Sequence, residues 1–61
     1  MDNPRLIDIN ELSQWLSIPR GTIYNLVYQH RIPFLKIGRS LRFDVAAIEQ
    51  YLKPHAEPER Q

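Results

Sequence analysis

The segment PRGTIYNLVYQHRIPFLKIGRSLRF, residues 19–43, decides how this chain folds. Its first half predicts a helix that begins at Pro19 or Arg20 and ends near Gln29, because apolar residues recur there at i, i+3 and i+4. These apolar residues are Ile23, Leu26 and Val27. Pro33 ends the element, since proline disfavours the helical conformation of the residue before it.

The second half of this segment predicts a β-hairpin. Two short apolar and aromatic runs, 34–37 and 41–43, flank the turn Gly38-Arg39-Ser40. Side chains alternate along a strand, so Leu35 and Ile37 share a face, as do Leu41 and Phe43, and Lys36 and Arg42 fall on the other face. A lone hairpin is marginal in water, so its apolar face must pack on helices. Phe34 and Phe43 are therefore expected to pack against the core.

A helix over residues 9–16 is expected before this segment. Asp8 is a good N-cap, and Glu11 three residues later completes a capping box. One apolar face follows at i, i+3 and i+4, and this places Trp15 in the predicted core. The residues of that face are Leu12, Trp15 and Leu16.

A third helix is expected after the hairpin. Asp44 is its N-cap, and Phe43 and Ile48 form a hydrophobic staple across its start. Lys53 lies near its C-terminal end, where a cation is favoured, and Pro54 is expected to end it.

The positive charge is concentrated in the middle of the chain. The net charge is only +1, yet no acidic residue lies between Leu12 and Phe43. That window has a local charge of +5, which is typical of a protein with a polyanionic partner, most often nucleic acid, although charge alone fits a solvated basic face equally well. Its basic residues are Arg20, Arg31, Lys36, Arg39 and Arg42.

Two short helices joined by a three- or four-residue turn form a helix-turn-helix, whose second helix enters the major groove of DNA. Arginine can bind guanine and asparagine can bind adenine through two hydrogen bonds each. The positive end of the helix also favours a phosphate. The residues of this helix expected to contact DNA are Arg20, Gly21, Thr22, Tyr24, Asn25 and Tyr28.

The basic hairpin completes the pattern as a wing, with Lys36, Arg39, Ser40 and Arg42 as expected DNA contacts. The predicted fold class is mostly α with a small β-hairpin, a single winged helix-turn-helix domain over residues 6–53. Residues 1–5 and 54–61 are expected to be disordered, because they can bury little apolar surface.

Two stretches carry a resemblance to a known family: residues 19–27, Pro-Arg-Gly-Thr-Ile-Tyr-Asn-Leu-Val, and residues 33–43, Pro-Phe-Leu-Lys-Ile-Gly-Arg-Ser-Leu-Arg-Phe. Over about residues 6–52 the chain resembles the excisionase or AlpA-like regulators of phages and prophages, whose domain is related to MerR-type DNA-binding heads. The resemblance implies DNA binding by the second helix in the major groove and by the wing beside it.

The chain departs from the family pattern in three places. Ser17 stands where the family usually has glycine in the turn, and Pro19 where it usually has a capping serine. Tyr51 stands where tryptophan is frequent.

Together these features predict a cytoplasmic, sequence-specific double-stranded DNA-binding protein that acts in transcription regulation or DNA recombination. Its further partners would be a second copy on repeated half-sites or a recombinase. The alternative is an adaptor or antirepressor whose basic face meets an acidic protein, and alanine at Arg20 and Asn25 would distinguish the two. RNA binding is a weaker option, because the aromatic platform of RNA-binding sheets is missing.

Other function classes find no support in the sequence. It has no cysteine and only two histidines, His30 and His55, so we expect neither a metal site nor another cofactor. No nucleophile–base pair or phosphate-cradling glycine loop indicates an enzyme or a small-molecule site. No apolar run approaches the roughly 18 residues of a membrane span.

Three side chains keep two interpretations. Tyr24 flanks the buried stripe of its helix and could pack or bind. His30 is expected near the end of that helix, where a cation is favoured, or it could act as a ligand. Arg42 could contact DNA or pair with Asp44 or Glu49.

Overall fold

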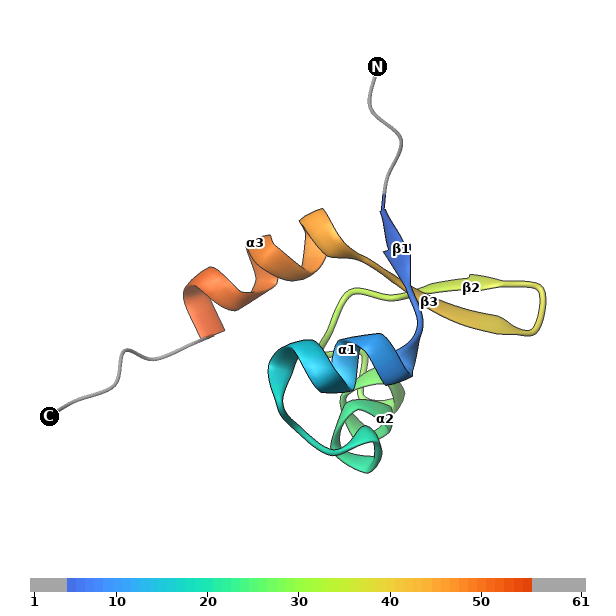
Figure 1. Ribbon diagram of the computed structural model, residues 1–61, viewed down its shortest axis with the longest axis horizontal. Coiled ribbons are helices and arrows are strands. Elements are labelled where there is room, and N and C mark those ends of the chain that lie inside the picture. Colours follow the sequence, from blue (N-terminus) through green and yellow to red (C-terminus); the bar gives the residue numbers. More distant parts are fainter. Residues whose placement is uncertain (1–4, 56–61) are drawn as a thin grey trace, which may run out of the picture.

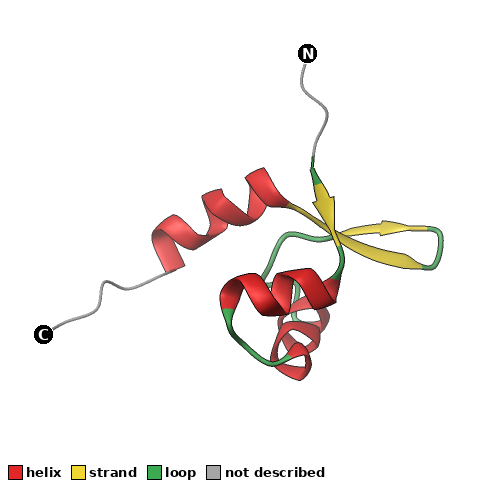
Figure 2. Ribbon diagram, in the orientation of Figure 1, coloured by secondary structure: helices red, strands yellow, loops and turns green. Residues whose placement is uncertain are grey.

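The computed structural model describes residues 5–55 of the chain (Figure 1). Three helices and a small antiparallel sheet form the winged helix-turn-helix that the sequence predicts (Figure 2). The β2–β3 hairpin and α3 project in different directions from the region where β1 meets β3 (Figure 1). In chain order the elements are β1 (Leu6–Ile7), α1 (Ile9–Leu16), α2 (Arg20–Tyr28), β2 (Leu35–Ile37), β3 (Ser40–Asp44) and α3 (Val45–His55).

Helix α1 begins with the predicted capping box. The backbone N–H of Glu11 donates to Oδ1 of Asp8 at 2.9 Å, and Oε1 of Glu11 accepts from the N–H of Asp8 at 3.2 Å. The helix ends at Ser17, which has φ 58° and so lies in the left-handed region. This conformation explains why a glycine would suit position 17.

Helix α2 starts and ends differently. Pro19 is its N-cap and supplies no side-chain hydrogen bond to the first turn. At the other end the N–H groups of His30 and Arg31 donate to the carbonyls of Val27 and Leu26, at 3.0 and 2.9 Å. This pair of bonds is a Schellman motif, and His30, with φ 55°, occupies its left-handed position.

The sheet has a third strand that the sequence analysis missed. The strand order is β1-β3-β2, with Leu6 opposite Asp44 and Ile7 opposite Phe43. The carbonyl of Arg5 extends this pairing by accepting from the N–H of Val45 at 2.9 Å. A two-residue strand is too short to show an alternating pattern, so only its tertiary pairing reveals it.

The register of the hairpin corrects the expected faces. Ile37 lies opposite Ser40, so the turn is the two-residue Gly38-Arg39 and not a three-residue one. Gly38 has φ 60° and is the one positive-φ residue of this turn, as in a type II′ turn. Shortening the turn by one residue exchanges the faces of one strand relative to the other. Lys36 therefore shares a face with Leu41, whereas Arg42 shares the opposite face with Leu35.

Every helix and strand except β2 contributes a buried residue to the core. Its buried residues are Ile7, Leu12, Ile23, Ile32, Phe43 and Ile48, and Phe34 and Leu41 pack partly against them. The expectation for Trp15 is wrong, because this side chain is 40% exposed while Leu12 is fully buried. In so short a helix the buried stripe is narrow, and it runs through Leu12 with Leu16 half-buried beside it.

Helix α3 begins as predicted, with the N–H of Ala46 donating to Oδ1 of Asp44 at 3.1 Å. It continues through Pro54 to His55, so the expected end at Lys53 is wrong. Pro54 has no backbone N–H to donate, and its position limits this loss to the last turn of the helix. Disorder was expected for residues 1–5 and 54–61. Arg5 pairs with Val45, and residues 54 and 55 belong to α3, whereas residues 1–4 and 56–61 lie outside the described residues. Within residues 5–55 no helix is long and apolar enough to span a membrane.

Candidate nucleic-acid interface

One surface of α2 is made of the residues that the sequence predicted as DNA contacts. All six are exposed: Arg20, Gly21, Thr22, Tyr24, Asn25 and Tyr28. The first turn of α2 contains no acidic residue and no side-chain cap, so its backbone N–H groups keep their positive potential. By contrast, the same groups of α1 are neutralised by its own carboxylates. An anion would therefore be favoured at the start of α2 and not at the start of α1.

Arg20 is held in place by a residue that the sequence analysis did not select. Its Nη1 donates to Oδ1 of Asn10 in α1 at 2.7 Å. A guanidinium has five N–H donors, so this bond leaves donors for a partner. Only the folded structure brings Asn10 and Arg20 together, which is why the sequence carried no signal for it.

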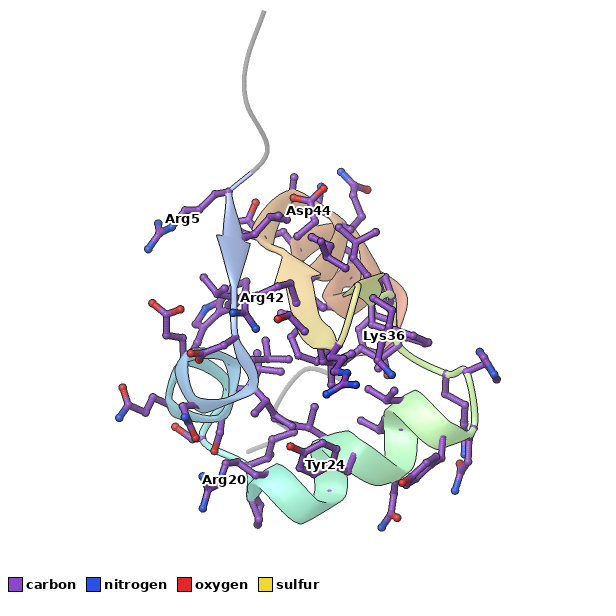
Figure 3. The ribbon with its side chains drawn as sticks, turned by 90° about the vertical axis from the view of Figure 1, so that its right-hand side faces the viewer. Arg5, Arg20, Tyr24, Lys36, Arg42 and Asp44 are labelled. Carbon is purple, nitrogen blue, oxygen red and sulfur yellow. The ribbon has the colours of Figure 1, made fainter. Side chains whose placement is uncertain are left out.

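A cleft lies between α2 and the hairpin and has a volume of about 400 Å³. It brings together four of the predicted contact residues: Tyr24 and Tyr28 from α2, Lys36 from β2 and Arg39 from the turn. Figure 3 shows Tyr24 on the side of α2 toward the hairpin, with Lys36 across from it. Within the described residues, no hydrogen bond or ion pair engages Lys36 or Arg39, so both cations are available to a ligand.

The sequence analysis did not choose the other four residues that line the cleft as contacts: Val27, His30, Phe34 and Leu41. The left-handed conformation of His30 turns the chain at the end of α2. Its ring lies 5.7 Å from the ring of Phe34, with the planes inclined by 39°. Phe34 packs partly against the core as predicted, yet it also faces the cleft.

The structure does not bring Ser40 and Arg42 into this cleft. Both lie on the opposite face of the hairpin, beside Ile37 and Leu35. Arg42 is half-buried and its Nη1 donates to the carbonyl of Leu41 at 2.8 Å. No ion pair joins Arg42 to Asp44 or Glu49 within the described residues, so the expected pairing is not seen, and the expected DNA contact of Arg42 stays a prediction.

Metal chemistry finds no site in this part of the molecule. Among the residues that the structure describes, no three histidine, cysteine or carboxylate side chains are grouped as ligands would be. The exposed polar side chains of α2 and the hairpin are cations, amides and hydroxyls.

Comparison with known proteins gives one match. A family model described as a helix-turn-helix domain matches residues 6–56, which is most of the chain and all of its core. No curated protein and no solved structure matches the chain significantly. With this match, the exposed second helix and the basic cleft beside it, the chain belongs to the helix-turn-helix domain family, a family of DNA-binding domains.

Proposed function

We propose that this protein binds double-stranded DNA sequence-specifically, with α2 in the major groove and the cleft side of the hairpin on the adjacent backbone. The observation that carries the proposal is the cleft, because it places the free cations Lys36 and Arg39 beside the exposed face of α2. A strand of the duplex lying between α2 and the hairpin would meet both cations on the hairpin side and the hydroxyls of Tyr24 and Tyr28 on the α2 side.

The two parts of this surface have different roles. Arg20 and Thr22 lie in the first turn of α2, the part of a recognition helix that reaches base edges, and Asn25 is exposed just past the middle of the helix. We assign sequence recognition to them, with Arg20 suited to guanine and Asn25 to adenine. Lys36 and Arg39 are assigned to phosphates, which supply affinity and register but little sequence information.

The small size of the domain bears on its biological role. A single domain of this kind reads few base pairs, so specific binding needs several copies on repeated half-sites. We propose an excisionase-like or prophage-type regulator that bends DNA, blocks polymerase or recruits a recombinase at such sites. The resemblance of residues 19–27 and 33–43 to that family supports the role.

The direct test is selection from a pool of random duplexes, followed by sequencing of the retained DNA. Fluorescence anisotropy at several salt concentrations then gives the affinity for the enriched sequence. We expect a defined motif and a salt dependence that corresponds to roughly 3–5 phosphate contacts at about −0.9 each. Absence of binding would contradict the proposal, and enrichment without a motif would contradict sequence-specific binding.

Two variants assign the recognition role. Arg20→Ala and Asn25→Ala should relax the base preference at one position of the motif each, at a cost of about 1–3 kcal/mol. Gln14→Ala is the matched control, since Gln14 is also an exposed amide but lies on α1. Gln14→Ala should keep the full motif. If Arg20→Ala and Asn25→Ala keep it as well, α2 does not read the bases and an acidic protein partner becomes the better account.

A further inference from the structure

The cleft between α2 and the hairpin is lined by more aromatic surface than contact with a paired backbone requires. In a regular duplex the bases are stacked inside, and the backbone presents only phosphates and sugars. Yet the rings of Tyr24, Tyr28, His30 and Phe34 all line the cleft. Such rings gain most from a planar group that can stack on them.

Packing in the protein core does not explain why tyrosines occupy positions 24 and 28. Tyr28 is 81% exposed and Tyr24 is 46% exposed, while Ile23 of the same helix is fully buried. Tyr24 and Tyr28 are four residues apart on α2, so their rings lie on one face, a turn from each other. This leaves an aromatic wall that is open at Tyr28 and half-open at Tyr24.

The charges around this wall match a phosphate. Lys36 and Arg39 lie on the hairpin side, and no acidic residue lines the cleft. His30 and Phe34 also line the cleft, with their ring centroids 5.7 Å apart. The volume of about 400 Å³ is within the roughly 300–1,000 Å³ of small-ligand sites. A planar ring joined to a phosphate is the chemistry of a nucleotide.

We propose that the cleft binds one unstacked nucleotide of a distorted duplex, with its base against Tyr28 and Tyr24 and its phosphate on Lys36 and Arg39. The inference rests on the proposed function, because the rest of the duplex would be held by α2. Removing a base from the stack costs least where that base is already unpaired. The protein should therefore prefer a duplex that contains an unpaired base.

The test compares two duplexes that differ by one nucleotide. The first is fully paired, and the second, the bulged duplex, has the same sequence with one additional, unpaired adenine in one strand. Their dissociation constants are measured by fluorescence anisotropy at one salt concentration. Base–aromatic stacking changes affinity about 5- to 150-fold per base, so we expect about tenfold tighter binding to the bulged duplex. Equal affinity for the two duplexes would overturn the inference and leave the proposed function standing, whereas binding to neither would overturn both.

Two substitutions at Tyr28 separate stacking from hydrogen bonding. Tyr28→Phe keeps the ring and loses the hydroxyl, so the preference for the bulged duplex should remain. Tyr28→Leu removes the ring, so the ratio of the two affinities should fall to about one. Loss of the preference in both variants would mean a hydroxyl–phosphate contact and would overturn the stacking assignment. Because Tyr28 is 81% exposed, neither change should alter the fold, which circular dichroism checks.

Discussion

The two faces of the β2–β3 hairpin carry similar residues but have different roles. One face holds Lys36 and Leu41, which line the cleft, and Phe43, which is fully buried. The other holds Arg42 with Leu35 and Ile37, which are 43% and 54% exposed. Each face has one cation and apolar neighbours, so composition does not tell them apart. The register of the hairpin alone decides which face packs on the protein and which cation faces α2.

The largest expected difference between the faces is in stability. Phe43→Ala should lower the free energy of unfolding by about 3–5 kcal/mol, because it empties a fully buried site. A domain of this size has only about that much stability, so the variant should be largely unfolded. Ile37→Thr should change the free energy by no more than about 0.5 kcal/mol. Urea unfolding followed by circular dichroism measures both, and similar losses would contradict the assignment of faces.

The sequence was sufficient to predict the three helices and the hairpin because their signals are local. Capping side chains at Asp8 and Asp44, and the apolar spacing around Ile23, mark the helix positions without tertiary information. The faces of the hairpin were mistaken because they depend on whether Ser40 belongs to the turn or the strand. A glycine turn of two or three residues fits the same sequence, and the pairing of Ile37 with Ser40 decides between them.

Part of the candidate site could be predicted, because the signals for α2 are also local. The contacts on α2 follow from its position as the second helix, and the structure exposes all of them. The contributions of Asn10, His30 and Phe34 could not be predicted, because they arise from packing between elements or from a left-handed turn. Lys36 was predicted as a contact and lines the cleft, but it was expected on a face shared with Arg42, which the register excludes.

The two glycines provide a smaller and sharper comparison. Neither would bring an added Cβ within 4 Å of another atom, so only the backbone conformation matters. Gly38→Ala should destabilise the hairpin by about 1 kcal/mol, because Gly38 has φ 60°. Gly21→Ala lies in α2 and should stabilise the protein by about 0.5–1 kcal/mol. Urea midpoints that shift in the same direction for both variants would contradict the two-residue turn.

The smallest expected effect lies at the turn between α1 and α2. Ser17→Gly should stabilise the protein by about 0.5 kcal/mol, because glycine adopts φ 58° with little strain while adding some entropy to the unfolded chain. Affinity for duplex DNA should not change, since Ser17 is outside both α2 and the cleft. Thermal unfolding with and without DNA measures both quantities. A decrease in stability would show that the left-handed conformation is not maintained in solution.

The salt dependence of duplex affinity in Lys36→Gln and Arg42→Gln tests most directly the claim that the cleft side of the hairpin faces DNA. Both variants remove one cation from the hairpin, one from each face. Each phosphate contact contributes about 0.9 to the slope of log affinity against log salt. We expect Lys36→Gln to reduce the slope by about that amount and Arg42→Gln to leave it at the wild-type value. A reduction in Arg42→Gln with none in Lys36→Gln would contradict the account, because the opposite face of the hairpin would then lie on the DNA.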